Sequence, residues 1–212
     1  MRGQMTADWI ATGLSQDLPP GVALAGAWNG VDLAIWRSVA GRISAWKDRC
    51  PHRGMRLSHG FVRGETLACI YHGWVYGTSG VCRHIPAHPA LTPPDAIRPE
   101  AFACTEADGV IWVAPVGITT PPPAFPGLYP LRSLSMTVGA DDLRKAEPAL
   151  SGAVALQGRC FVQGQAVTLC LLPQPRAGGV RVHVLCDAGT DRVQVSRWLE
   201  DLRRRAEAGV AA

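Results

Sequence analysis

The chain has 212 residues, of which 47% are hydrophobic, and a formal net charge of +4 that comes almost entirely from arginine. This length and apolar content are enough for one medium domain and one smaller domain, each with its own core. The modest charge comes with no aromatic and basic platform and no nucleic-acid-binding motif, so nucleic acid is excluded as an expected partner.

Cysteine use and the N-terminal sequence indicate the compartment. Residues 1–14 contain polar Gln4, Thr6 and Asp8 and no apolar core of signal-peptide length. No later run approaches the about 18 apolar residues that a membrane-spanning helix needs. Five cysteines lie mostly in apolar, strand-like stretches, where free cysteine acts as a small buried hydrophobe. They are Cys82, Cys104, Cys160, Cys170 and Cys186. We therefore expect a cytoplasmic protein in a reducing compartment, without a disulfide framework and without a membrane partner.

The first structured region is predicted to be antiparallel β-sheet. Short apolar runs fill residues 22–46, and Asn29-Gly30 and Gly41 divide them. Asn-Gly is a strong signal for a tight β-hairpin turn. We expect consecutive hairpin strands that lead up to Trp46.

Two short segments after these strands each combine one cysteine and one histidine on a loop that ends in glycine. They are Cys50-Pro51-His52-Arg53-Gly54 and Cys69-Ile70-Tyr71-His72-Gly73. Two thiolates and two imidazoles, divided between two irons, are the ligand set of a Rieske [2Fe-2S] cluster. We predict that Cys50 and Cys69 bind the inner iron and that His52 and His72 bind the outer, more exposed iron. The closing glycines permit the tight backbone that brings amide donors close to the bridging sulfides.

A zinc site would use the same residue types. Cys2His2 zinc sites usually pair one Cys-x2-4-Cys arm with one His-x3-5-His arm, whereas both arms here are mixed. A chance combination of structural cysteines and core histidines is a further alternative, but the chain has only six histidines and both loops would have to mimic the pattern. Both alternatives stay open, and the mixed arms favour the iron-sulfur cluster.

Around these loops the sequence resembles the N-terminal domain of the oxygenase subunits of Rieske non-haem iron oxygenases. The likeness extends from about Trp9 to about Val116, which is about half of the chain. The segments that carry it, besides the loops, are residues 17–21, 45–49, 56–60, 80–87 and 109–113. The resemblance implies a fold that is mainly β or α+β, with an antiparallel β-sandwich that holds the cluster near its surface.

The loops depart from those of the Rieske proteins of quinol-oxidising respiratory complexes. Each loop of those proteins has an additional cysteine, and the two form a disulfide; Met55 and Tyr71 stand where these would be expected. Trp74 stands where such proteins usually have a serine that donates to a cluster sulfide. We therefore expect a reduction potential in the lower part of the Rieske range of about −150 to +300 mV.

Breakers in the sequence set the expected domain boundaries. Residues 60–70 are predicted to form another hairpin, which would place both ligand loops at one end of a small sheet. Prolines become frequent after Ala114 and favour an extended connector without regular structure. We predict a Rieske domain at 1–116, a proline-rich linker at 117–130 and a second domain at 131–212.

The second domain is predicted to contain three strands and a final helix. We expect strands at 151–156, 160–172 and 180–186, with Ala177-Gly178-Gly179 as the turn before the last one. The helix is expected to begin with Thr190 as its N-cap. An apolar stripe at helical spacing, typical of core packing, consists of Val195, Trp198, Leu199, Leu202 and Ala206.

Strands followed by a long final helix resemble a shortened form of the helix-grip catalytic domain of the same family. In that family two histidines on a helix and one carboxylate bind a mononuclear iron, and no such segment is found here. His84 and His88 are four residues apart, but Pro86 lies between them and prevents a regular helix. His183 alternates with valines in a predicted strand. The sequence therefore argues against a mononuclear non-haem iron in this chain.

The leading functional hypothesis is a Rieske electron-transfer protein or subunit. It would relay electrons from a flavin or ferredoxin-type reductase to a separate mononuclear-iron catalytic subunit, without a catalytic residue of its own. Exposed sheet edges in the short second domain would favour pairing with that oxygenase subunit or with a second copy of the chain.

Two alternatives remain. One is a compact Rieske mono- or dioxygenase or demethylase for a small aromatic or methylated substrate, with an iron site built from His84, His88 or His183 and an acid such as Asp187. The other is a scaffold or regulatory partner without redox function, which the complete ligand set argues against.

Arginines gather on or near the ligand loops: Arg49, Arg53, Arg56, Arg63 and Arg83. Such a collar could steer an acidic redox partner. The alternative interpretation is an ordinary solvated basic surface.

Overall fold

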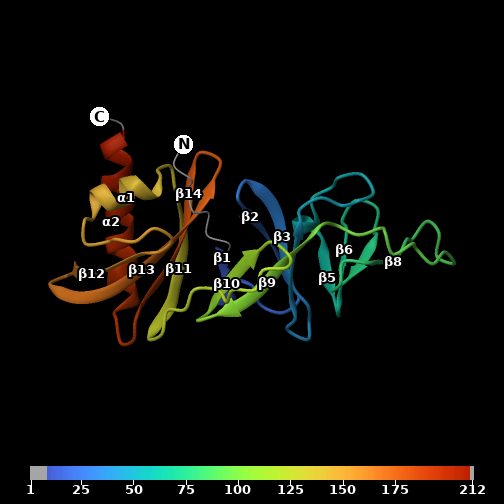
Figure 1. Ribbon diagram of the computed structural model, residues 1–212, viewed down its shortest axis with the longest axis horizontal. Helices are drawn as coiled ribbons and strands as arrows, with labels where there is room; N and C mark the ends of the chain where they lie inside the picture. Colours follow the sequence, from blue (N-terminus) through green and yellow to red (C-terminus); the bar gives the residue numbers. More distant parts are fainter. Residues whose placement is uncertain (1–8, 211–212) are drawn as a thin grey trace. The chain divides into compact units, whose positions relative to one another are not determined.

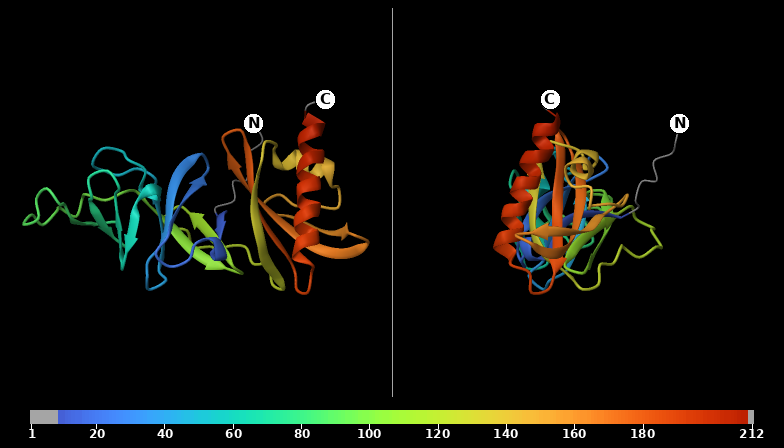
Figure 2. Two further views of the ribbon diagram at one scale, coloured as in Figure 1. Left: turned by 180° about the vertical axis from the view of Figure 1, so that it is seen from behind. Right: turned by 90° about the vertical axis from the view of Figure 1, so that its left-hand side faces the viewer.

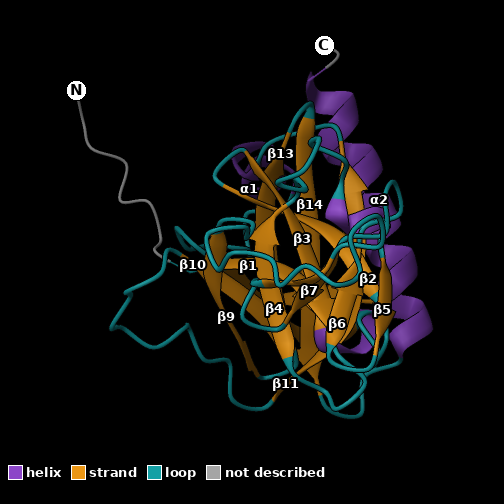
Figure 3. Cartoon of the chain, turned by 90° about the vertical axis from the view of Figure 1, so that its right-hand side faces the viewer, coloured by secondary structure: helices purple, strands orange, loops and turns teal. Residues whose placement is uncertain are grey.

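The computed structural model describes residues 9–210 and is mainly antiparallel β-sheet, as predicted; α1 and α2 are its α-helices (Figure 3). The strands and helices run in chain order as β1 (Ile10–Leu14), η1 (Ser15–Asp17), β2 (Ala23–Trp28), β3 (Val31–Arg37), β4 (Ile43–Lys47), η2 (Leu57–His59), β5 (Phe61–Arg63), β6 (Thr66–Ala68), β7 (Val75–Gly77), β8 (Cys82–His84), β9 (Ala101–Ala107), β10 (Val110–Ala114), β11 (Leu128–Met136), α1 (Ala140–Ala146), β12 (Leu156–Val162), β13 (Gln165–Arg176), β14 (Gly179–Asp187) and α2 (Arg192–Val210).

The chain folds into two compact units. We name them the ligand-loop unit, which contains residues 15–106 and 111–121, and the helix–sheet unit, which among the described residues contains 9–14, 107–110 and 122–210. The helix–sheet unit is therefore discontinuous in sequence. The predicted boundaries at 116 and 130 remain sequence-based predictions, and the polar residues Gln4, Thr6 and Asp8 lie outside the described residues.

The ligand-loop unit contains two antiparallel sheets. The strands that this unit contributes to the larger sheet lie in the order β10-β9-β4-β3-β2. The strands of the smaller sheet lie in the order β5-β6-β7-β8. The predicted Asn-Gly turn joins β2 to β3, where Asn29 and Gly30 both have positive φ, 43° and 80°. The predicted hairpin over residues 60–70 forms as β5 and β6.

The core of the ligand-loop unit is aromatic next to the ligand loops. Trp36 and Trp46 are fully buried and pack edge to face with ring centroids 5.1 Å apart, and Trp46 contacts Tyr76 in the same manner at 6.3 Å. The ligand cysteines belong to the same buried cluster of side chains. This rigid packing fixes the strands from which both ligand loops emerge.

The helix–sheet unit packs α2 across one face of a four-stranded sheet, as Figure 2 shows. The sheet order is β11-β14-β13-β12, and all neighbours are antiparallel (Figure 1). The predicted apolar stripe of the helix faces this sheet, because Val195, Leu199, Leu202 and Ala206 are buried against it. The strand predicted at 180–186 forms as β14, and Ala177 and Gly178 make the turn before it, whereas the expected turn residue Gly179 is the first residue of β14.

Three expectations for this unit were wrong. Residues 151–155 form no strand; Ser151 makes only an isolated bridge with Gln157, and β12 begins at Leu156. The single strand expected at 160–172 is a hairpin, since Gln163 and Gly164 turn the chain with φ of 52° and 79° between β12 and β13. The N-cap of α2 is Asp191, whose Oδ1 accepts the backbone N–H groups of Val193 and Gln194. Thr190 instead donates its hydroxyl to Asp187.

Among the unpredicted elements are β11 and α1. β11 begins inside the expected linker and includes Pro130, and α1 has seven residues. Within residues 9–210, neither helix has the length and apolarity that crossing a bilayer would require.

Candidate metal centre

The two ligand loops have the same backbone architecture. In each loop the cysteine N–H donates to the carbonyl oxygen five residues further on, and the N–H of the closing glycine donates back to the cysteine carbonyl. The N···O distances are 2.8 and 2.8 Å in the loop from Cys50, and 2.9 and 3.0 Å in the loop from Cys69. Gly54 and Gly73 have φ of 74° and 67°, a conformation that favours glycine. Each loop therefore holds one cysteine and one histidine in the same backbone geometry.

The loop from Cys50 follows β4 and is fastened by a buried carboxylate. Asp48 accepts the backbone N–H of Ser58 at 2.7 Å and its hydroxyl at 2.6 Å, and the Arg56 guanidinium lies 3.4 Å away. The Asp48 side chain has no exposed surface. A buried carboxylate held by several donors fixes the chain on both sides of the loop.

The two thiols lie together in the interior. Cys50 and Cys69 are 3% and 2% exposed and interact side chain to side chain. Burial and the neighbouring Cys50 raise the pKa of the Cys69 thiol, while the N–H groups of Tyr71 and His72 lower it. The second loop thus directs backbone donors at its thiol, which is how proteins stabilise a thiolate ligand.

The two imidazoles lie together toward the surface. The ring centroids of His52 and His72 are 4.7 Å apart. Trp74 stacks on His52 at 4.3 Å with an interplanar angle of 5°, and Tyr71 contacts His72 at 3.8 Å. Desolvation, and then the neighbouring His72, lower the pKa of His52, which favours the neutral imidazole that binds metal.

Tyr76 provides a hydrogen bond to the buried side of the site. Its Oη lies 3.1 Å from the Cys50 sulfur. A thiolate can only accept, so toward a metal-bound Cys50 the phenol is the donor. Burial, and then the contact with Cys50, raise the pKa of Tyr76, so this hydroxyl keeps its proton.

This donor set fits a Rieske cluster. The four side chains face one another as a thiol pair and an imidazole pair, and each pair takes one member from each loop. Within residues 9–210 no three His, Cys, Asp or Glu side chains converge on a point suitable for a single metal ion. Two separate pairs match two irons with two ligands each, rather than one zinc ion with four.

The other candidate ligands are dispersed. His84 ends β8 and His88 lies in the exposed loop after it. His183 is fully buried in β14, where its Nδ1 lies 2.8 Å from the Ser133 hydroxyl, and Asp187 ends that strand. The described residues bring no three of these side chains together as a metal site.

Comparison with known proteins agrees with the geometry. Residues 8–96 match the family model described as Rieske [2Fe-2S] domain. The chain carries a Rieske [2Fe-2S] domain. Its homologues include members of the Rieske non-haem iron oxygenase family.

Two curated relatives show the extent of the sequence likeness. The chain is 42% identical over 106 residues to oxidoreductase NdmD of Pseudomonas putida, which is 49% of this chain and 18% of NdmD. It is 36% identical over 124 residues to 4beta-methylsterol monooxygenase of Methylococcus capsulatus, which is 52% of this chain and 33% of that protein. The chain thus spans a third or less of these two curated relatives.

The structure of NdmA from Pseudomonas putida CBB5 shares the fold more widely. It superimposes on 95% of this chain and 79% of NdmA with a TM-score of 0.72 and 19% identity. Most of the chain, with residues of both units, therefore shares the fold of NdmA.

Sequence reasoning missed two supporting residues and one arginine. Asp48 and Tyr76 were not singled out, although each lies close to a ligand in sequence, two residues before Cys50 and four after His72. Arg98, 26 residues beyond His72, lies beside the first loop together with Arg49 and Arg53.

The other arginines of the predicted collar are placed differently. Arg56 is engaged by Asp32 and Asp48, and Arg63 is at the end of the β5–β6 hairpin, away from Cys69. Arg83 lies on β8, with its guanidinium against Gly77.

Proposed function

We propose that the chain is an electron-transfer protein or subunit of a Rieske oxygenase system, which accepts electrons from a flavin or ferredoxin-type reductase and passes them to a separate mononuclear-iron catalytic subunit. The observation that carries this proposal is a contrast within the chain. The two thiols and the two imidazoles of the predicted ligand set lie in pairs that suit a cluster, whereas the described residues offer no three-residue group for a single catalytic metal ion.

The cluster, when bound, supplies a one-electron couple. The residues of the chain determine how partners reach it. Cys50 and Cys69 hold its inner side in the core, whereas His72 is exposed and His52 half-buried, so the imidazole pair is the side nearest to a docked protein. Tyr76 and the backbone donors of the loops stabilise charge on the thiolates.

Two further observations support a partner-dependent role. One relative bears the name oxidoreductase and is similar over the Rieske region. In the helix–sheet unit, β11 and β12 are the outer strands of the four-stranded sheet, and Phe161 on β12 is 72% exposed. Outer strands with exposed apolar side chains favour pairing with another chain, either an oxygenase subunit or a second copy.

A compact oxygenase is the second candidate. The fold shared with NdmA over 95% of the chain favours it, as does the similarity to a named monooxygenase. This function would need a second iron that is bound outside the ligand loops.

Iron and acid-labile sulfide per chain, together with the EPR spectrum of the dithionite-reduced protein, separate the two. We expect two irons, two sulfides and a Rieske-type signal, with no hydroxylation or demethylation when only a reductase is added. Cys69→Ser should lose both iron and signal. A third iron that persists in this variant, or turnover with the reductase alone, would establish the oxygenase instead. A colourless, iron-free protein from iron-replete cells would indicate a scaffold.

A further inference from the structure

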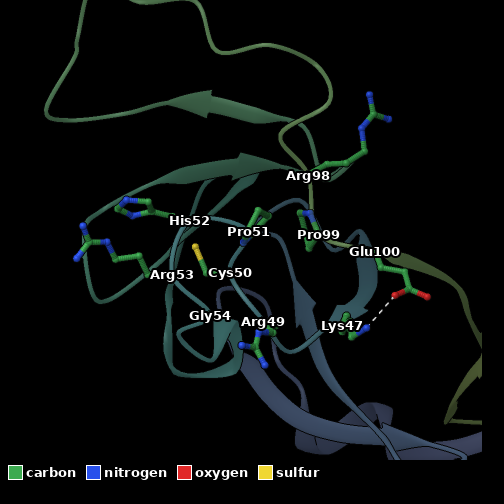
Figure 4. Close-up of a pocket in the computed structure, with 10 residues that line it drawn as sticks. All are labelled: Lys47, Arg49, Cys50, Pro51, His52, Arg53, Gly54, Arg98, Pro99 and Glu100. Carbon is green, nitrogen blue, oxygen red and sulfur yellow. Dashed lines mark hydrogen bonds and ion pairs between the residues drawn. The ribbon is translucent and has the colours of Figure 1, made fainter.

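The surface beside the first ligand loop is hollow and basic. An open hollow of about 510 Å³ is lined by the loop itself and by residues from two other segments. Figure 4 shows Arg49, Arg53 and Arg98 spread around Cys50 and Pro51, with His52 next to Arg53. The hollow lies entirely within the ligand-loop unit.

Its positive charge is not neutralised within the described chain. The one acid of the lining, Glu100, is paired with Lys47 at 3.2 Å. Arg49, Arg53 and Arg98 have no carboxylate within ion-pair distance among residues 9–210; Arg98 donates only to the backbone carbonyl of Asp95. Three guanidinium groups therefore remain available for an acidic partner.

An apolar area adjoins the basic hollow through the ligand histidines. Tyr71 contacts His72, and His72 contacts His52, which lines the hollow. Tyr71 is 55% exposed and Ile70 is 48% exposed, although both are large apolar side chains. Exposed apolar side chains bordered by charge are the usual composition of a protein interface.

We propose that this surface docks the acidic face of a one-electron donor protein, with Arg49, Arg53 and Arg98 pairing its carboxylates and with Ile70 and Tyr71 at its apolar contact. The proposal rests on the proposed electron-transfer function and names the chemistry of the donor. A donor must arrive and leave once per electron, so long-range attraction that raises the association rate serves it best. A permanently bound subunit would instead need a larger apolar area than two exposed side chains provide.

The test is the affinity for a plant-type [2Fe-2S] ferredoxin with an acidic surface, measured by calorimetry with both proteins oxidised. Measurements at about 20 mM and about 300 mM salt separate charge pairing from apolar contact, because the distance over which salt screens exposed charges falls from about 20 Å to about 6 Å between these concentrations. We expect the triple variant Arg49→Glu, Arg53→Glu, Arg98→Glu to bind about tenfold more weakly than wild type at low salt and nearly equally at high salt. Ile70→Ser should weaken binding by a similar factor at both salt concentrations.

Arg63→Glu is the matched control. This substitution changes the charge by the same amount as each of the three arginine substitutions and lies in the same unit. The strand register places Arg63 at the end of the β5–β6 hairpin that is remote from Cys69. We expect it to change the affinity less than twofold. The proposal is overturned if Arg63→Glu weakens binding as much as Arg49→Glu, Arg53→Glu and Arg98→Glu each do alone, or if the triple variant has unchanged affinity at low salt. The triple Arg→Gln variant, which introduces no repulsion, should give a smaller loss with the same salt dependence.

Photoreduced deazariboflavin, which is uncharged, separates this proposal from the proposed function. It should reduce the wild type and all arginine variants at similar rates. If it reduces them but the variants bind ferredoxin as wild type does, only the docking surface is wrong. If the chain holds no reducible centre at all, the electron-transfer function itself fails.

Discussion

The two units place histidine in opposite surroundings. In the ligand-loop unit, His52 and His72 lie on loops, contact each other and reach the surface. In the helix–sheet unit, His183 is fully buried in a strand, where Ser133 holds Nδ1 and Nε2 has no hydrogen-bond partner in the described chain. One residue type is thus predicted to serve as a metal ligand in one unit and is a buried, neutral side chain in the other. Access and neighbours, rather than residue type, decide which role it takes.

Removal of the Asp48 carboxylate should have the largest effect on stability, and the unit that it destabilises should be the ligand-loop unit. Asp48→Ala leaves the Ser58 N–H without its acceptor and deprives Arg56 of one partner. We expect the free energy of unfolding to fall by about 3 kcal/mol, because the variant leaves buried polar groups without hydrogen-bond partners. Denaturant titration measures this loss.

Asp95→Ala is the control for that variant, because Asp95 is exposed and contributes only its backbone carbonyl to a hydrogen bond. Its stability should stay within about 0.5 kcal/mol of wild type. If Asp48→Ala were equally harmless, the first ligand loop would be held by its backbone alone.

Acid should destabilise the helix–sheet unit through His183. Burial, and then Arg181 and Arg176, lower the pKa of this histidine from 6.5 to about 3. The unfolded chain therefore binds a proton that the folded chain does not accept between these values. The resulting stability is complete above pH 6.5 and is lost as the pH falls toward 3, by about 3 kcal/mol at about pH 4.5.

His183→Leu should remove this part of the pH dependence whatever it does to stability at neutral pH. Unfolding free energies measured at several pH values give the slope of stability against pH. The control variant His88→Asn, at an exposed position, should leave this slope unchanged. A slope that stays the same in His183→Leu would mean that this side chain takes up its proton in the folded protein.

The smallest effect is expected at the ligand-loop unit, in the reduction potential. Tyr76→Phe removes the donor 3.1 Å from the Cys50 sulfur and so destabilises the more negative, reduced state. A loss of about 1 kcal/mol corresponds to a potential lower by about 40 mV for one electron. Redox titration of Tyr76→Phe beside the exposed Tyr71→Phe measures the difference. A wild-type potential far above zero would contradict the low range that Met55, Tyr71 and Trp74 indicate.

The ligand loops could be predicted from the sequence because their chemistry is local. Each loop packs two ligands and a left-handed glycine into five residues, and each backbone hydrogen bond closes within six. The Asn29-Gly30 turn is local in the same sense. The contact of Tyr76 with Cys50 and that of Arg98 with the hollow depend on how strands pair, which residue spacing does not reveal.

The helix–sheet unit was harder to predict for physical reasons. The turn at Gln163-Gly164 lacks the usual Asn or Asp and joins two apolar strands, so the hairpin has the pattern of one long strand. Pro130 suggested a linker, yet β11 tolerates it because the strand is at the sheet edge and its register shifts between Pro130 and Arg132. Thr190 and Asp191 are both good caps, and only the contacts show that Asp191 is used.

The discontinuity of the helix–sheet unit has a consequence for synthesis of the chain. β1 leaves the ribosome first but packs against β13 and β14, which follow more than 150 residues later. All four predicted cluster ligands lie between residues 50 and 72, and the ligand-loop unit ends at residue 121. A nascent chain can therefore contain the whole ligand-loop unit before β13 and β14 have been synthesised, so the helix–sheet unit is the last to be completed.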